Sequence, residues 1–167
     1  MRRRFTASLL AGMIAIGIIA APVSAATPSQ SIADIAIANG NFTTLVAALS
    51  CTGLVPAVSD PNATLTVFAP TDSAFKKLGL TAANVCRVPK SLLAKILTYH
   101  VVGKELFAAD VLASKRIKTL SGLYVFPSVR HGNAYLNWYS KIVATDIVAS
   151  NGVIHVIDHV LIPYRFW

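Results

Sequence analysis

The chain has 167 residues, and its 15 Lys and Arg residues outnumber its seven Asp and Glu residues, for a formal net charge of +8. Three of the basic residues lie at positions 2–4 in a predicted leader, so the rest of the chain has 12 basic against seven acidic residues, or +5. This modest charge excludes a nucleic-acid binder that works by charge alone. About 140 residues remain, which is enough for one domain.

Residues 1–25 have the three parts of a secretory signal peptide. The arginines precede an apolar run over residues 9–21, which is too short for a comfortable membrane span of ~20 residues. Small residues at 23–25 suit signal peptidase, so we expect cleavage after Ala25 or Ala26. A twin-arginine signal is the alternative, but the strongly apolar run favours general secretion.

We therefore expect an exported protein, secreted or periplasmic, without a stable membrane anchor. The predicted organisation is a short segment at 26–30, one folded domain at 31–163 and a tail at 164–167. The tail has no apolar stretch that would direct a C-terminal anchor.

The first half of the domain is predicted to be mainly helical. Ser31 and Asp34 form a plausible capping box at the start of a first helix. Apolar residues at helical spacing predict a second amphipathic helix that ends near Gly53; they are Phe42, Leu45, Val46 and Leu49.

One short strand interrupts these helices. Residues 65–69 alternate in the way expected of a strand with one buried face. Thr71 or Asp72 can then cap a third helix. A fourth helix, over residues 92–97, is expected to begin just after Pro89.

From His100 onward the pattern changes to strands. The predicted strands, separated by Gly, Asn or Ser turns, cover residues 117–120, 123–129, 135–138 and 142–148. Asn151-Gly152 stands between two apolar runs and predicts a hairpin with a type I′ turn. Helices early and strands late predict an α+β fold, with helices covering one side of a mostly antiparallel sheet.

The domain contains two cysteines, Cys51 and Cys86. Export to an oxidising compartment predicts a disulfide between them. The alternative is a reactive thiol, which would need an activating base that the sequence does not identify.

Residues that could support catalysis lack a suitable arrangement. His155 and His159 are four positions apart, but on a strand that spacing spans ~13 Å, too wide for one metal ion. The sequence has no nucleophile elbow and no glycine-rich phosphate loop. We expect no enzymatic activity, no metal and no cofactor.

Two groups of side chains suggest surface roles. Lys115, Arg116 and Lys118 form either a solvated strand edge or a surface for acidic polysaccharide or anionic lipid. A set of aromatic residues forms either an apolar groove or core and cross-strand pairs; it comprises Phe126, Tyr135, Trp138 and Tyr139.

Three segments, in order, resemble motifs of the fasciclin (FAS1) family: TLTVFAPTDSAF at 64–75, ILTYHVV at 96–102 and DIVASNGVIHVIDHVLIP at 146–163. The resemblance extends over residues 31–163. It implies an α+β domain, a β-wedge or sandwich of mostly antiparallel strands with a cluster of helices. The two cysteines are also similar in position to a pair found in single-domain microbial members.

The resemblance implies a non-catalytic adhesion or extracellular-matrix module whose partner is an extracellular protein or polysaccharide. By analogy with a Tyr-His pair and an Asp-Ile pair implicated in integrin recognition by animal members, the candidate partner-binding residues are Tyr99, His100, Asp146 and Ile147. A structural role is the alternative for these positions, with His100 hydrogen-bonded in the core. Some members bind carotenoids or other apolar molecules, so a carrier of a carotenoid or lipid is the alternative function.

Overall fold

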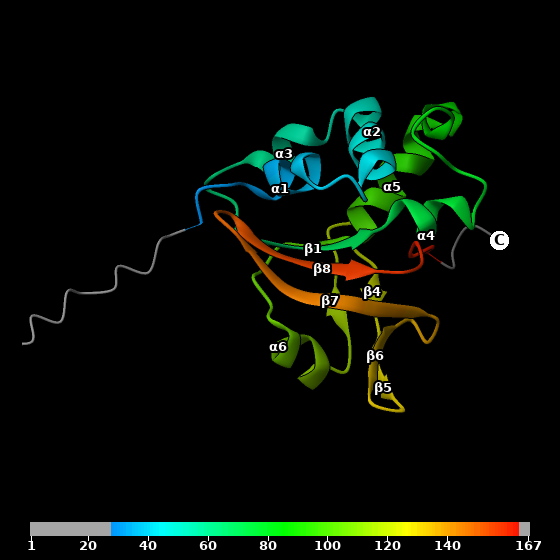
Figure 1. Ribbon diagram of the computed structural model, residues 1–167. Helices are drawn as coiled ribbons and strands as arrows, with labels where there is room; N and C mark the ends of the chain where they lie inside the picture. Colours follow the sequence, from blue (N-terminus) through cyan, green and yellow to red (C-terminus); the bar gives the residue numbers. More distant parts are fainter. Residues whose placement is uncertain (1–27, 164–167) are drawn as a thin grey trace, which may run out of the picture.

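A mixed six-stranded sheet runs through the middle of the molecule, with a layer of helices on one side (Figure 1). The computed structural model describes residues 28–163. The predicted leader and the tail at 164–167 lie outside the described residues. Within the described part of the chain, no helix is long and apolar enough to cross a membrane.

Most of the helices lie before residue 100. They are α1 (Ile32–Ala38), α2 (Thr43–Thr52), α3 (Val55–Ser59), α4 (Asp72–Lys76), the 3₁₀ turn η1 (Val85–Arg87), α5 (Lys90–Tyr99) and α6 (Ala108–Ala113). The four helices predicted from the sequence are confirmed, whereas α3 and α6 were not predicted. Both are one to two turns long, too short to produce a recognisable apolar period.

The strands follow the predicted order, with one addition after α5, but the single strand predicted at 123–129 is divided into two strands that belong to different sheets. They are β1 (Leu65–Pro70), β2 (Val101–Val102), β3 (Ile117–Lys118), β4 (Tyr124–Val125), β5 (Pro127–Arg130), β6 (Asn133–Leu136), β7 (Ser140–Ala149) and β8 (Gly152–Ile157). The large sheet has the order β2-β1-β8-β7-β6-β5, and β3 and β4 form a separate pair. The α+β fold class is therefore confirmed.

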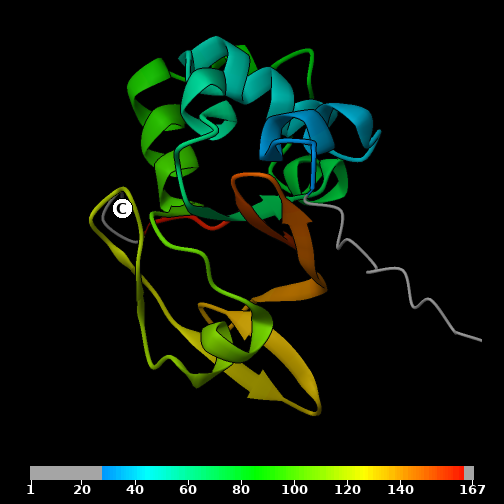
Figure 2. The same ribbon diagram turned by 90° about the vertical axis from the view of Figure 1, so that its left-hand side faces the viewer.

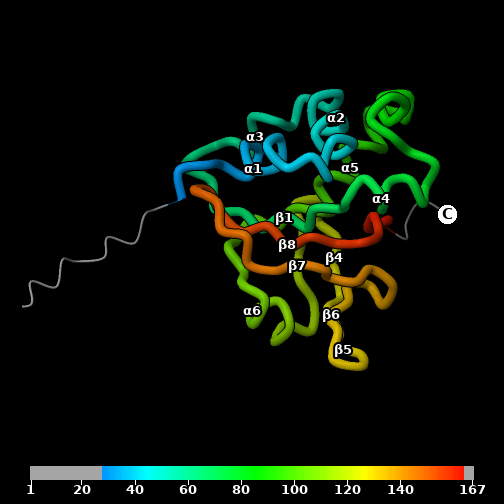
Figure 3. Tube along the Cα trace, in the orientation of Figure 1, coloured from blue at the N-terminus to red at the C-terminus, as the bar shows by residue number. Residues whose placement is uncertain are grey.

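The sheet is antiparallel except at its centre, where β1 and β8 run parallel. These two strands come from opposite ends of the domain and lie side by side (Figure 3). The predicted single buried face of β1 is wrong, because every residue from Leu65 to Pro70 is buried. A strand that is paired on both edges and covered on both faces is typically apolar along its whole length.

The two faces of β1 belong to two different hydrophobic clusters. Leu65, Val67 and Ala69 pack in a cluster with the helices, whereas Phe68 packs in a second cluster with β4, β6 and β7. We call residues 31–100, which contain β1 and the helices above the sheet, the helical half. We call residues 107–149, which contain α6 and β3–β7, the strand half. Figure 2 shows this division, with the helices above and the strands below.

Short polar side chains begin α1 and α4, as the sequence predicts. Ser31 and Asp34 form a complete capping box at α1. Thr71 caps α4, which leaves the Asp72 carboxylate free to accept hydrogen bonds from the N–H groups of Thr43 and Thr44 at the start of α2. Burial opposes ionisation of Asp72, but these hydrogen bonds outweigh it and hold its pKa below the usual value.

The predicted hairpin connects β7 and β8, but its turn is not type I′. Asn151 does not adopt a positive φ, and its buried side chain bonds instead to the Ile32 N–H and to the carbonyls of Val58 and Asp60. Gly152 has a φ of 144°, and a side chain there would collide with the backbone of Leu65. Long-range contacts rather than turn geometry therefore select this pair of residues.

Cys51 in α2 and Cys86 in η1 are joined by a disulfide. Their Cα atoms are 5.8 Å apart, and the bond links two segments of the helical half that lie 35 residues apart in the chain. The predicted pairing is present in the structure.

Candidate functional site

An exposed line of aromatic and basic side chains extends along the strand half. Its aromatic members, 37, 46 and 63% exposed respectively, are Tyr124, Phe126 and Trp138. Its basic members, all exposed, are Arg116, Lys118 and Arg130. We refer to these six residues as the aromatic–basic stripe.

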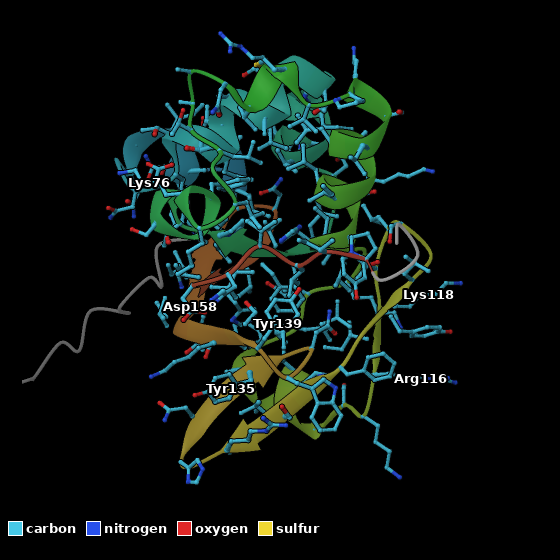
Figure 4. All side chains as sticks on the ribbon, turned by 90° about the vertical axis from the view of Figure 1, so that its right-hand side faces the viewer. Lys76, Arg116, Lys118, Tyr135, Tyr139 and Asp158 are labelled. Atoms are coloured by element: carbon cyan, nitrogen blue, oxygen red, sulfur yellow. A yellow bond between two sulfur atoms is a disulfide. The ribbon has the colours of Figure 1, made fainter. Side chains whose placement is uncertain are left out.

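The first part of the stripe is built on the β3–β4 pair. The guanidinium carbon of Arg116 lies 4.7 Å from the centroid of the Tyr124 ring, within cation–π distance. Lys118 is the cross-strand partner of Tyr124, so the two side chains share one face of the pair. Arg116 and Lys118 extend from the same edge of the molecule (Figure 4).

The second part of the stripe follows directly along the chain. Val125 is fully buried between Tyr124 and Phe126, so strand alternation places both aromatic rings on the solvent side. Phe126 exchanges hydrogen bonds with Asn137: its N–H donates to the side-chain oxygen at 3.0 Å and its carbonyl accepts from the N–H at 2.9 Å. This pairing places the Asn137-Trp138 turn across from Phe126.

The turn that carries Trp138 has an unfavourable backbone. Asn137 and Trp138 have φ values of 48° and 74°, a region in which L-residues other than Asn and Gly are uncommon. Arg130 stacks on the Trp138 ring with its guanidinium carbon 5.0 Å from the centroid. A strained turn that presents a large exposed apolar ring is a feature typical of binding surfaces.

Buried hydrogen bonds hold the stripe in place from below. The Asn137 amide donates to the Tyr99 hydroxyl at 2.9 Å, and that hydroxyl donates to the Tyr124 carbonyl at 2.8 Å. Tyr99 thus connects the end of α5 to both parts of the stripe. Its side chain is 2% exposed, so Tyr99 affects this surface indirectly, by holding the Tyr124 backbone and the Asn137 side chain in place.

An open groove of about 620 Å³ lies beside the β3 end of the stripe. Arg116 and Lys118 line it together with Lys104, which extends the basic surface. Its apolar walls include Val102, Leu106, Ile117 and Leu120. The third predicted basic residue, Lys115, is exposed but does not line the groove.

Carboxylates do not neutralise the stripe. Within residues 28–163, none of its three basic side chains forms an ion pair with Asp or Glu, and the pair recorded within 4 Å joins Asp158 to His159. Asp110 and Asp146, the acids of the strand half, accept hydrogen bonds from backbone N–H groups at the start of α6. Glu105, exposed next to Lys104, is the carboxylate closest to the groove in sequence.

His100, a predicted partner-binding residue, is enclosed in the core. Its Nδ1 donates to the Ile96 carbonyl at 2.7 Å and its Nε2 accepts from the Leu161 N–H at 2.8 Å, an arrangement that requires the neutral ring. Burial, opposed by the hydrogen bond to Ile96, lowers the pKa of His100 from 6.5 to about 4. This geometry assigns His100 a role in stability, and partner contact by Tyr99 and His100 stays an untested prediction.

Asp146 and Ile147, the other predicted pair, lie at a bulge in β7 and point to different environments. Ile147 packs against the helical cluster. Asp146 is exposed with a φ of 58°, and its carboxylate accepts from the Ala108 N–H at 2.7 Å. The fold therefore does not unite the Tyr-His pair and the Asp-Ile pair in one exposed site, and their role in partner binding remains a prediction.

The two histidines of the last strand region occupy separate environments. His155 is buried in β8, stacks on Phe68 and bonds through Nε2 to the Leu106 carbonyl at 2.8 Å. Burial lowers the pKa of His155 more than that hydrogen bond raises it. His159 lies beyond β8 beside Asp158 and Lys77. In the part of the chain that the structure describes, no three His, Cys, Asp or Glu side chains are grouped to hold a metal ion.

The aromatic residues predicted as one set are divided between two environments. Phe126 and Trp138 belong to the stripe, whereas the Tyr139 hydroxyl bonds inward to Val160 and Ile162. Tyr135, on β6, is half-buried and lies opposite Lys141 of β7 (Figure 4 labels Tyr135). Tyr124 was not among the residues predicted from the sequence, although its position two residues before Phe126 in a predicted strand places both on the same face.

Comparison with known proteins identifies relatives of the whole domain. The family model named Fasciclin domain matches residues 40–163. The chain is similar to Protein sll1483 of Synechocystis sp., with 42% identity over 142 residues that cover 83% of this chain and 77% of that protein. It is also similar to the immunogenic protein MPB70 of Mycobacterium bovis, with 35% identity over 85% of this chain and 74% of that protein.

Two further relatives come from animals. The pig transforming growth factor-beta-induced protein ig-h3 is 34% identical over 136 residues, which are 81% of this chain but 20% of that protein. A solved FAS1 domain pair from the insect cell adhesion molecule Fasciclin I has a TM-score of 0.69 at 17% identity, covering 83% of this chain and 52% of the solved one. At this identity the second likeness concerns the fold alone.

Proposed function

Because this chain belongs to the Fasciclin domain family, we propose that it is an exported, non-catalytic interaction module that binds an extracellular protein or polysaccharide through its strand half. One observation carries the assignment of that half. Among residues 28–163, all exposed large apolar side chains except Ile37 and Leu78 lie between Phe107 and Val148. Exposed apolar surface concentrated on one side of a domain typically marks a contact with another molecule.

Membership of the Fasciclin domain family supports the same proposal. The fold is shared with a FAS1 domain pair from the insect cell adhesion molecule Fasciclin I. The predicted leader at residues 1–25 supports export. Recovery of the protein outside the cytoplasm, with an intact mass that corresponds to cleavage after Ala25 or Ala26, tests that part of the proposal.

The enclosed core cavity gives the carrier function little support. The enclosed apolar pocket bounded by α1, α2, β1 and α5 has a volume of about 20 Å³, room for little more than one water molecule. A carotenoid would require this core to open. Native mass spectrometry of the protein from its own source tests the carrier, because a bound ligand would add mass that gentle denaturation removes.

Adhesion can be tested with two matched double variants. Phe126→Ser with Trp138→Ser removes two exposed apolar side chains from the strand half, and Ile37→Ser with Leu78→Ser removes two from the helical half. The exposed fractions are comparable, 46 and 63% for Phe126 and Trp138 against 61 and 43% for Ile37 and Leu78. All four side chains lie on the surface, so we expect both variants to fold.

The domain would be biotinylated at its N-terminus, coated on beads and exposed to cells and extracted extracellular matrix of the source organism. We expect the strand-half variant to reduce bead retention by more than about fivefold, because truncating central aromatic anchors removes most binding energy. The helical-half variant should retain wild-type binding. Equal losses in the two variants, or no retention of wild-type beads, would overturn the proposed function.

A further inference from the structure

We infer that the aromatic–basic stripe and its adjoining groove bind an acidic polysaccharide, an inference that rests on the proposed function and specifies its partner. The two kinds of side chain in the stripe alternate in space rather than forming separate patches. Arg116 lies over Tyr124, Lys118 lies across from the same ring, and Arg130 lies over Trp138. A ligand that contacts the rings therefore meets a positive charge at each end.

Sugar rings and acidic substituents match these two kinds of side chain. The C–H faces of a pyranose are apolar and stack on aromatic rings, which are exposed here at Tyr124, Phe126 and Trp138. Carboxylate or sulfate groups on the same sugar accept hydrogen bonds from Arg and Lys. Since no described carboxylate pairs with the basic residues of the stripe, their charge is available to an outside anion.

The groove continues this surface in one direction. Arg116 and Lys118 face both the stripe and the groove, and Lys104 adds a cation at the groove wall. The groove is open and about 620 Å³ in volume, comparable to pockets that accommodate small ligands. A chain of several sugars could therefore contact the rings of the stripe and place an acidic group in the groove.

The arrangement favours a polysaccharide over an anionic membrane. A protein that binds a membrane interface inserts its aromatic rings below the level of its charged groups. Here Arg130 is stacked on the Trp138 ring and Arg116 on the Tyr124 ring, so insertion of either ring would carry a guanidinium with it. The stripe instead places exposed aromatic rings and positive charges side by side.

Binding would be measured by calorimetry with three probes: oligogalacturonate, which carries carboxylates, chondroitin sulfate oligosaccharides, which also carry sulfates, and neutral dextran oligosaccharides. Vesicles of phosphatidylcholine with phosphatidylglycerol provide the membrane probe. We expect binding to at least one acidic oligosaccharide that weakens as salt rises, and none to dextran.

Variants locate the site. Arg116→Gln with Lys118→Gln should weaken binding about tenfold at low salt and flatten its salt dependence. Trp138→Ala should weaken binding about fivefold and leave the salt dependence unchanged, because it removes stacking but no charge. Lys115→Gln and Lys90→Gln, which remove exposed charges outside the stripe, should change affinity less than twofold.

Other outcomes would overturn the inference. Binding to vesicles alone, or equal losses in Lys115→Gln and in the stripe variants, would exclude the stripe as a polysaccharide site. If the beads described above adhere but neither acidic oligosaccharide binds, the inference fails while the proposed function stands. If neither assay detects binding, both fail.

Discussion

Acidic side chains stabilise helix starts in both halves of the domain, but the two halves differ in how much apolar surface they expose. In the helical half, Asp34 and Asp72 stabilise helix starts, and the exposed large apolar side chains are Ile37 and Leu78 alone. In the strand half, Asp146 stabilises the start of α6 in the same way, yet Phe126 and Trp138 remain exposed. Within residues 28–163, all non-glycine residues with positive φ also lie in the strand half, between positions 131 and 146.

This difference indicates that the two halves have different roles. The helical half and the central strands supply stability, which allows strained turns and exposed rings to persist on the other side. Hence the two halves should respond differently to mutation: changes in the helical half should reduce stability, and changes on the stripe should reduce binding.

The largest expected effect comes from opening the disulfide of the helical half. Cys51→Ser with Cys86→Ser should lower the free energy of unfolding by about 3–4 kcal/mol, since a cross-link 35 residues apart limits the entropy of the unfolded chain. Guanidinium denaturation measures the loss, and hydrogen exchange locates it. We expect faster exchange in α2 and η1 than in β6 and β7, whereas a uniform increase would show that the halves do not differ.

His100 provides the next largest effect, at the boundary between the halves. Because its pKa is about 4 in the folded protein and 6.5 ordinarily, the unfolded chain binds more protons between these values. The stability contributed by neutral His100 is therefore complete above pH 6.5 and is lost as the pH falls toward 4, by about 3 kcal/mol.

Urea denaturation of the wild type and of His100→Gln between pH 7.5 and 4.5 measures this contribution. The variant should be less stable at pH 7.5, because the Ile96 and Leu161 backbone groups lose well-placed partners. Its stability should also fall less steeply with decreasing pH. Parallel profiles for the two proteins would contradict the assignment.

The smallest expected effect is a gain in stability in the strand half. His131 and Gly132 form the two-residue connection between β5 and β6 and have φ values of 49° and 72°, as a type I′ turn requires. Asn tolerates the left-handed region better than His, so His131→Asn should raise stability by about 0.5 kcal/mol. Thermal denaturation measures the change, and bead retention should stay at the wild-type level.

Much of the fold was predictable because its signals are local. The capping box of Ser31 and Asp34, the helical spacing from Phe42 to Leu49 and the hairpin near Asn151 all depend on residues close in sequence. The family motifs then identified the overall architecture correctly.

Features set by distant contacts could not be predicted in this way. The Asn151 side chain binds backbone groups more than 90 residues away, which excluded the turn that Asn-Gly normally forms. Left-handed turn residues instead join β5 to β6 at His131-Gly132 and join β6 to β7 at Asn137-Trp138, and neither pair is an Asn-Gly sequence. Likewise, the stripe combines Arg116, Tyr124 and Trp138, which share a surface only after β3, β4 and β6 have assembled.

The position of β8 has a consequence for how the protein acquires its shape. This strand occupies the interior of the large sheet, yet its residues, Gly152–Ile157, follow almost the whole domain in the chain. Until they emerge from the ribosome or a secretion channel, β1 and β7 have no common neighbour, and both hydrophobic clusters lack the residues that β8 contributes. Folding through such distant pairings is slow. A chain that is exported unfolded therefore remains incompletely folded throughout its passage and completes its fold only after its last strand arrives.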